Sequence, residues 1–271
     1  MTAAAPVILL HGFAQTPASW NEVARLLQAR GHRAYALDLY ARVEDGMDTL
    51  CQYVADTVRQ VAEVEGAPVL VGYSMGGRVA VETLVRHGFQ PLRSCEHGAW
   101  AEAEESTEGL LPRAGLVQES AGLGPSDEAA RAALAERNAA WAARLREEGV
   151  DAFMDWWETL PLFATQQELP AETRAAIRVE RTSHSTEVLA HSLEAWGAHH
   201  QATESETIAA LSRAHVQGLP FLYIAGERDE KYAAVADRLQ TVGLPVALIS
   251  PAGHNTHLED PAAFAELLAC F

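Results

Sequence analysis

Residues 69–78 read VLVGYSMGGR, and this stretch decides how the rest of the chain is interpreted. Its first four residues are an apolar run typical of a buried strand, and a helical pattern begins at Gly76. Between them lies the pattern G-x-S-x-G, centred on Ser74. So tight a strand-to-helix turn presents the Ser74 hydroxyl above the sheet, and side chains at Gly72 or Gly76 would clash. The amides that open the helix stabilise negative charge at the same place. The stretch therefore predicts a serine nucleophile.

Short apolar runs of the same kind recur along the chain and are separated by helical patterns. We expect buried strands at residues 7–10, 34–37, 69–72, 115–118, 221–225 and 246–249. Helices are expected at residues 18–30, 48–64, 76–87, 233–242 and 261–270, where apolar residues recur at three- and four-residue spacing. This alternation predicts an α/β protein with a mainly parallel sheet that is flanked by helices on both faces.

Two stretches interrupt the alternation. Residues 90–113 are acidic and loop-like, which predicts a solvated insertion. Residues 126–212 have helical patterns in place of strands, and one helical face there carries Leu134, Trp141 and Leu145. An insertion at this point of a parallel sheet lies over the carboxyl ends of the strands, where ligands bind. We therefore predict a core formed by residues 1–125 and 213–271, with a helical cap formed by residues 126–212.

Two further segments supply the partners that a serine nucleophile needs. Asp229 follows the fifth expected strand and His254 follows the sixth, so both would meet Ser74 at one edge of the sheet. The chain order Ser74, Asp229, His254 is that of α/β-hydrolases. His254 would take a proton from Ser74, and Asp229 would hold the imidazole tautomer and offset its charge. Glu227 and Asp260 are competing acids, but Asp229 has the better position.

The turn after the first expected strand completes the predicted site. A His-Gly pair at residues 11–12 frees the backbone N–H of Phe13. With the N–H of Met75, it would make a two-donor oxyanion hole. His11 itself is expected to be a structural turn residue and is assigned no chemistry.

The charge balance narrows the classes of partner. The chain has 271 residues with 20 Lys+Arg and 37 Asp+Glu, a net charge of −17, and 48% of its residues are hydrophobic. This is the composition of a soluble globular protein. So negative a charge argues against nucleic acid and against an anionic membrane. It leaves room for a small anionic substrate, because a few arginines can reverse the field inside one pocket.

The ends, the cysteines and the histidines exclude other classes. We expect no signal peptide, and no apolar run is long enough to span a bilayer. The three cysteines have no CxxC pair and fit reduced thiols: Cys51, Cys95 and Cys270. The histidine pairs do not form a metal-ligand set with nearby acids: His184/His191 and His199/His200. We expect a cytoplasmic protein without metal or cofactor, and a monomer or small homo-oligomer.

Several segments together resemble a known family. LHGF (10–13), GYSMGGR (72–78), AGERDEKY (225–232), AGHNTHLEDP (252–261) and the block around Trp156-Trp157 resemble the 2-succinyl-6-hydroxy-2,4-cyclohexadiene-1-carboxylate synthases of menaquinone biosynthesis. The resemblance runs over nearly the whole chain. It implies the α/β-hydrolase fold with a helical cap over the C-terminal strand ends. It also implies a lyase with no metal, no cofactor and no acyl-enzyme.

The implied reaction starts from 2-succinyl-5-enolpyruvyl-6-hydroxy-3-cyclohexene-1-carboxylate. The triad serine, made basic by the histidine, removes a proton beside the succinyl ketone, and pyruvate leaves. The residues alone do not choose this reaction over a carboxylesterase or a carbon–carbon bond hydrolase, because each needs a base and an oxyanion hole. An inactive scaffold that only binds a ligand is a third hypothesis, against which the intact Ser74, Asp229 and His254 argue.

A small polycarboxylate substrate of this kind needs cations. Arg78 lies four residues after Ser74 on the expected helix and so on the same face, where its planar fork suits a carboxylate. The alternative is an exposed helical arginine. Arg181 aligns with a cap arginine that binds substrate in the family; the alternative is a solvated helical face.

The sequence departs from the family on the first cap helix. Leu134 stands where the family has another arginine. Arg131 and Arg137 lie three residues to either side, and Arg137 is our expected substitute. The resemblance also makes Trp156 a pocket residue, although core packing is the more common role of a tryptophan. Tyr73, inside the G-x-S-x-G turn, either donates its hydroxyl to the substrate or packs beside the serine.

Overall fold

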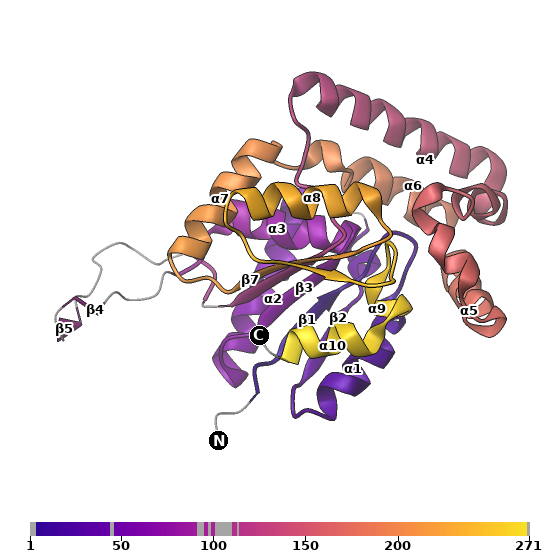
Figure 1. Ribbon diagram of the computed structural model, residues 1–271. Coiled ribbons are helices and arrows are strands. Elements are labelled where there is room, and N and C mark those ends of the chain that lie inside the picture. The colour runs from indigo at the N-terminus through magenta and orange to yellow at the C-terminus, as the bar shows by residue number, and fades with distance from the viewer. Residues whose placement is uncertain are drawn as a thin grey trace.

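A parallel sheet forms the centre of the protein, which the computed structural model describes at residues 4–43, 46–90, 95–96, 99–100, 110–112 and 114–269. Within these ranges six parallel strands pair in the order β2-β1-β3-β6-β7-β8 (Figure 1). They are Val7–Leu10 (β1), Ala34–Leu37 (β2), Val69–Tyr73 (β3), Gly115–Glu119 (β6), Phe221–Gly226 (β7) and Val246–Ile249 (β8). All six strands expected from the apolar runs are therefore present, and three are one residue longer than predicted.

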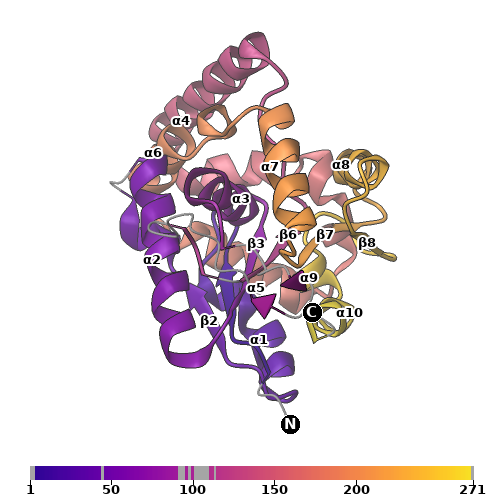
Figure 2. The same ribbon diagram turned by 90° about the vertical axis from the view of Figure 1, so that its left-hand side faces the viewer.

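Helices cover both faces of this sheet (Figures 1 and 2). One face carries α2 (Met47–Glu65), α3 (Met75–His87) and α8 (Glu230–Thr241), and the other carries α1 (Asn21–Gln28) and α10 (Pro261–Ala269). Successive side chains of β1 alternate between the two layers: Ile8 and Leu10 join the first core, and Val7 and Leu9 join the second. Because both faces are buried, the strands appear in the sequence as unbroken apolar runs.

Local capping explains where the structure differs from the expected helices. The helix expected at residues 18–30 divides into a 3-10 turn, Pro17–Trp20, and α1. The Thr16 hydroxyl caps that turn by accepting the N–H of Ala18 at 3.2 Å. α8 begins at Glu230, earlier than expected, because the Asp229 carboxylate accepts the N–H of Tyr232 at 3.3 Å. Two short helical segments were not predicted: Leu39–Arg42 and Thr256–Glu259 (α9).

Only helical segments lie between β6 and β7. They are α4 (Glu128–Trp157), a 3-10 segment (Pro161–Glu168), α5 (Ala171–Thr182), α6 (Thr186–Ala195), a 3-10 turn (Ala198–His200) and α7 (Glu204–Val216). α4 continues well beyond the predicted pattern and contains a break at Gly149, whose φ of 80° suits glycine. α4 packs along α6, whereas α7 packs against α3 beside the sheet (Figure 1). The predicted helical insertion is therefore present.

The acidic insertion predicted at residues 90–113 lies largely outside the described residues. Its described parts include a short antiparallel pair, Cys95–Glu96 (β4) with Ala99–Trp100 (β5), which the loop-like composition did not predict. Strands of two residues are too short to leave a periodic pattern. Cys51 is a buried free thiol in α2, and burial raises its pKa to about 12. Cys270 lies outside the described residues, and the side chain of Cys95 is not described.

The turn at Ser74 has the strained geometry that its glycines imply. Ser74 has φ 49° and ψ −103°, a backbone conformation that residues other than glycine rarely adopt. A Cβ at Gly72 would collide with the carbonyl of Gly76, and a Cβ at Gly76 would collide with the carbonyl of Leu10. At both glycines the close atoms belong to the backbone, so β3 and β1 approach α3 closely. Backbone atoms cannot move aside as the end of a flexible side chain can. The clash expected from the sequence at both glycines is therefore confirmed.

We expect Gly76→Ala to lower the free energy of unfolding by about 3 kcal/mol or more, because backbone at the end of β1 must shift. Gly46→Ala is the matched control, since a Cβ at Gly46 meets nothing within 4 Å. We expect that control to cost about 1 kcal/mol or less. Chemical denaturation followed by circular dichroism measures both. Equal stability of the two variants would mean that the close approach of α3 to β1 is not required.

None of the helices in the described ranges is both long and apolar enough to cross a membrane.

Candidate active site

The strand order opens a crevice at one edge of the sheet. β1 lies between β2 and β3, so the chain leaves β1 toward one side of the sheet and leaves β3 toward the other. Loops that diverge in this way leave room for a ligand outside the carboxyl ends of the strands. Phe13 follows β1 and Ser74 follows β3, so both come from the loops that border this point.

Three residues that are distant in sequence form a hydrogen-bonded chain there. His254 Nε2 lies 3.2 Å from Ser74 Oγ, and His254 Nδ1 lies 2.7 Å from Asp229 Oδ2. Asp229 and His254 are 6% and 1% exposed, while Ser74 borders a cavity. The buried carboxylate accepts Nδ1–H, which leaves Nε2 as the acceptor for the serine proton. The predicted trio is thus brought together with the geometry of a nucleophile, a base and an orienting acid.

The competing acids lie elsewhere. The Glu227 carboxylate is exposed and accepts the Ser250 hydroxyl at 2.5 Å. The Asp260 carboxylate accepts the N–H of Ala263 at 2.9 Å, at the start of α10. Neither of them contacts the imidazole in the way that Asp229 does.

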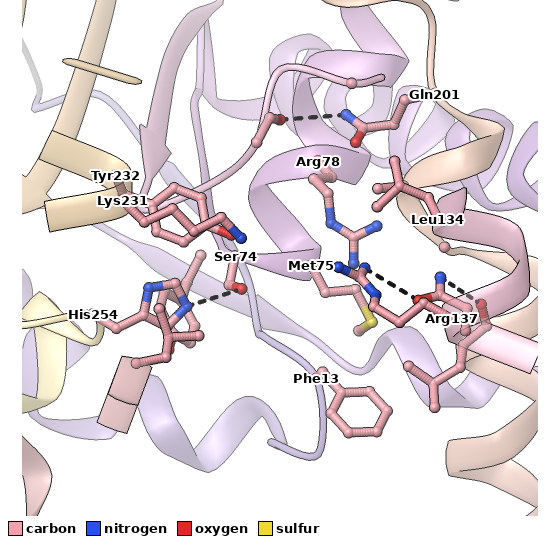
Figure 3. A pocket seen from close by; sticks show the side chains of 18 of the residues that line it. Phe13, Ser74, Met75, Arg78, Leu134, Arg137, Gln201, Lys231, Tyr232 and His254 are labelled. Atoms are coloured by element: carbon pink, nitrogen blue, oxygen red, sulfur yellow. Dashed lines mark hydrogen bonds between the residues drawn. The ribbon is translucent and has the colours of Figure 1, made fainter. Parts of the chain in front are cut away.

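Phe13 and Met75, whose backbone N–H groups were expected to act as donors, both line the cavity beside Ser74 (Figure 3). Met75 is the first residue of α3, so its N–H has no acceptor inside the helix. Phe13 is brought near by Gly12, whose Cβ, if present, would lie 2.6 Å from the Tyr73 ring. His11 is buried, and its Nε2 accepts the N–H of Leu39 at 3.1 Å, which is the structural role expected of it. The positions of Phe13 and Met75 suit an oxyanion hole.

The cavity beside Ser74 has a volume of about 380 Å³ and lies between the strand ends and α4, α6 and the 3-10 segments. Its lining is strongly basic for a protein with a net charge of −17. Five of the residues that line it are basic and one is acidic: Arg78, Arg137, Arg181, Lys231 and Arg238, against Glu204. The local field therefore favours an anionic ligand, opposite to the field of the whole chain.

Similarity to known proteins identifies the family. The model of the alpha/beta hydrolase family matches residues 7–267. The chain belongs to the alpha/beta hydrolase family. The α/β-hydrolase fold predicted from the sequence is thereby confirmed.

Curated proteins similar in sequence to this alpha/beta hydrolase include several synthases of one name. It is 32% identical to the 2-succinyl-6-hydroxy-2,4-cyclohexadiene-1-carboxylate synthase of Enterobacter sp. (strain 638), over 97% of this chain and 90% of the relative. The synthase of Salmonella paratyphi C (strain RKS4594) is 31% identical, over 97% and 92%. The resemblance inferred from the motifs is therefore confirmed at the level of homology.

Solved structures of similar proteins share the fold of this chain. MenH from S. aureus superposes with a TM-score of 0.79 at 26% identity, covering 97% of this chain and 91% of that one. The enol-lactonase from Burkholderia xenovorans LB400 has a TM-score of 0.70 at 16% identity, covering 98% and 90%, and shares the fold.

Arg78 of this alpha/beta hydrolase reaches the cavity from α3 (Figure 3). Its Nη1 donates to the carbonyl of Trp196 at 2.9 Å, and it forms no ion pair with any residue that the structure describes. Burial lowers the pKa of its guanidinium to about 10, so the group is still charged at neutral pH. A partly buried cation without a carboxylate partner is costly unless a ligand supplies one. The alternative of an exposed helical arginine is wrong.

Arg181 is only 5% exposed, so the alternative of a solvated helical face is also wrong. It borders the cavity, with its guanidinium 4.7 Å from the centre of the Phe163 ring. Nη1 pairs with Glu158 Oε1 at 3.1 Å, and Nη2 donates to Gln166 Oε1 at 2.8 Å. Part of its charge is therefore already compensated within the cap.

The position of the cap helix α4 decides between the two candidate arginines, Arg131 and Arg137. Leu134, which stands at the family's arginine position, does line the cavity, and so does Arg137 one turn later. Arg137 lies over the Trp141 ring at 4.6 Å. Arg131 turns away and donates to the carbonyls of His199 and Gln201 at 2.5 and 2.7 Å. Of the two candidates, the structure brings Arg137 to the cavity.

The expectation for Trp156 is corrected. Trp157 lines the cavity and packs 5.1 Å from the Phe13 ring. Trp156 instead packs among Phe153 and Trp141, under the guanidinium of Arg144 at 4.4 Å. Neighbouring residues of a helix point about 100° apart, and here Trp157 faces the cavity while Trp156 faces the cluster of rings beside it.

Tyr73 lines the cavity, with its ring 5.3 Å from that of His254. Burial, and secondarily the nearby Glu119 carboxylate, raises the pKa of its phenol well above the usual value. The hydroxyl therefore keeps its proton at neutral pH and is available as a donor.

A buried network behind the site was missed by the sequence analysis. The Glu119 carboxylate accepts Thr256 Oγ1 at 2.7 Å and lies 2.7 Å from His257 Nδ1. The Glu119 carbonyl accepts the N–H of Ser74 at 2.8 Å. One residue of β6 thus holds both the serine turn and the loop that carries His254. The signal was a charged residue ending a strand that begins with three apolar residues, GLVQE at residues 115–119, together with the second histidine of AGHNTH.

Within the described ranges, no three His, Cys, Asp or Glu side chains are grouped so that they could hold a metal ion.

Proposed function

We propose that this alpha/beta hydrolase is a carbon–oxygen lyase. It eliminates pyruvate from 2-succinyl-5-enolpyruvyl-6-hydroxy-3-cyclohexene-1-carboxylate and yields 2-succinyl-6-hydroxy-2,4-cyclohexadiene-1-carboxylate. The observation that carries the proposal is the basic lining of the cavity beside Ser74 in an otherwise acidic protein. A substrate with three carboxylates suits that lining, and two relatives that match 97% of the chain are named for this product.

The proposed first step is proton abstraction. Ser74 Oγ, which lies 3.2 Å from His254 Nε2, gives its proton to the imidazole as it takes the proton from the carbon beside the succinyl ketone. Asp229 offsets the charge of the imidazolium that forms. The N–H groups of Phe13 and Met75 stabilise the enolate oxygen.

In the second step the electron pair of the enolate moves through the ring double bond, and the carbon–oxygen bond to the enolpyruvyl group breaks. The leaving enolate takes up the proton held by His254 and becomes pyruvate, so the triad returns to its starting state. No covalent bond to Ser74 forms, which distinguishes this route from acyl transfer.

The remaining residues bind the substrate. Arg78, Arg137 and Arg181 interact with its carboxylates, and the Tyr73 hydroxyl donates a hydrogen bond to it. Residues 126–212 act as the cap that covers the substrate, and Trp157, rather than Trp156, forms part of its wall. Substrate enclosed in this way is shielded from water, which favours elimination over hydrolysis.

A carboxylesterase or carbon–carbon bond hydrolase is the second candidate. The same spacing of Ser74, His254 and Asp229 supports acyl transfer. The five basic residues around the cavity favour the lyase, because a neutral ester needs no such lining.

We expect the purified protein to release pyruvate from the enolpyruvyl substrate, as measured by NADH oxidation with lactate dehydrogenase. The value of kcat/KM for this reaction should exceed that for p-nitrophenyl acetate by roughly 100-fold or more, because only the anion uses the basic residues. A reaction without protein controls for spontaneous elimination. Fast ester turnover with an acyl group trapped on Ser74, and no pyruvate, would favour the hydrolase.

A further inference from the structure

The chain contains one lysine among its 20 Lys and Arg residues, and that residue is Lys231. The other 19 of these residues are arginines. Lys231 follows Asp229 by two residues in the first turn of α8 and is one of the residues that line the cavity. A side-chain ammonium group therefore stands at only one place in the sequence, beside the proposed triad.

The side chain of Lys231 extends from α8 into the cavity (Figure 3). Its Nζ lies 4.8 Å from the centre of the Tyr232 ring, and that ring lies 4.8 Å from the ring of His254. The aromatic face supports the ammonium close to the reacting groups without neutralising its charge.

The charge of Lys231 has no anionic partner among the described residues. Arg238, two turns further along α8, is paired with Glu204 at 2.8 Å, and Arg181 is paired with Glu158 at 3.1 Å. The cavity cations without an ion pair to a described residue are Arg78, Arg137 and Lys231. They come from α3, α4 and α8, so they reach the cavity from three different elements.

We propose that Lys231 is a substrate-binding residue that receives one carboxylate of the polycarboxylate substrate. The inference rests on the proposed function, since it gives the three carboxylates a third cation without an ion pair beside Arg78 and Arg137, while Arg181 shares its charge with Glu158. Arg78 and Arg137 supply rigid, planar forks on α3 and α4. Lys231 supplies a compact charge on a flexible stem from the wall formed by α8, so it can follow a carboxylate whose position changes when pyruvate leaves.

Lys231→Met keeps the length of the side chain and removes its charge. We expect it to raise KM for the enolpyruvyl substrate by about 10- to 100-fold, the range of a lost charge-assisted hydrogen bond, with kcat changed only a few-fold. Lys231→Arg should recover most of the affinity. Arg228→Met is the matched control, because Arg228 is an exposed cation paired with Glu168 outside the cavity, and it should leave KM unchanged.

The single lysine permits a second test on the unaltered protein. An amine-selective acylating reagent can modify only Lys231 and the N-terminal amine. Peptide mass spectrometry should show that propane-1,2,3-tricarboxylate slows acylation of Lys231 by about 10-fold while leaving the N-terminal amine unaffected.

The outcomes separate this proposal from the proposed function. Unchanged KM in Lys231→Met, or an equal rise in Arg228→Met, overturns the role of Lys231 even if pyruvate is released. Absence of protection by the tricarboxylate overturns it as well. If no pyruvate is released but the tricarboxylate protects Lys231, the lyase fails and the carboxylate site stands.

Discussion

Replacing His254 with alanine is expected to lower kcat/KM for pyruvate release by about 10⁴-fold. The reason is the 3.2 Å contact between His254 Nε2 and Ser74 Oγ, without which the hydroxyl has no acceptor for its proton. Ser74→Ala is expected to cause a loss of similar size. The double variant should lose little more, because groups that act as one unit are strongly non-additive. The coupled lactate dehydrogenase assay measures all three, and circular dichroism reports whether each variant folds.

Glu227→Gln is the matched control for the acid of the triad. Glu227 lies two residues before Asp229, but it is exposed and accepts a hydrogen bond from the Ser250 hydroxyl. Loss of the Glu227 carboxylate should therefore leave kcat/KM unchanged. Asp229→Asn should lower kcat strongly, because an amide cannot hold the same imidazole tautomer. Full activity in Ser74→Ala, together with loss in His254→Ala, would contradict the serine base and make His254 the direct base.

Arg78→Ala is expected to lower kcat/KM by about 100-fold or more through a rise in KM. Its guanidinium borders the cavity, is partly buried, and forms no ion pair with a described residue, so a carboxylate of the proposed substrate is its expected partner. Arg78→Lys keeps the charge but loses the planar fork and should fall between the parent and Arg78→Ala. Steady-state kinetics over a wide substrate range separates the effects on KM and kcat.

Arg78 also joins α3 to the cap through the carbonyl of Trp196 at 2.9 Å. Thermal unfolding of each variant distinguishes a loosened cap from a lost substrate contact. Arg25→Ala is the control for net charge, because Arg25 forms an exposed ion pair with Glu22 on α1 and does not line the cavity. An unchanged kcat/KM in Arg78→Ala would remove Arg78 from the site.

The charge of the cavity lining is opposite to the net charge of the chain. A net charge of −17 disfavours large polyanions over the whole surface, yet five basic residues converge on one space of about 380 Å³. In the proposed function, substrate recognition therefore depends on a few side chains acting against the overall field. Variants of those side chains should consequently affect KM far more than variants of surface arginines such as Arg25 or Arg228.

The sequence alone was sufficient for the features that local chemistry dictates. Buried strands need unbroken apolar runs, so all six were recognisable. The turn at Ser74 needs glycine at Gly72 and Gly76, because backbone carbonyls occupy the space of a side chain. Since Asp229 and His254 each follow such a strand, their meeting with Ser74 at one edge of a parallel sheet also followed from the order of elements.

Only the tertiary structure decided which side chains face the cavity. Helical spacing left Arg131 and Arg137 equivalent, as it did Trp156 and Trp157. The packing of α4 against α6 and α5 sets the rotation of α4 before and after its break at Gly149, and so turns Arg137 and Trp157 inward. The contact of Glu119 with His257 joins residues 138 positions apart and leaves no periodic signal. The physical reason is the same in each case: a turn or a strand is specified by its neighbours in sequence, whereas the direction of a side chain on a helix is specified by what that helix packs against.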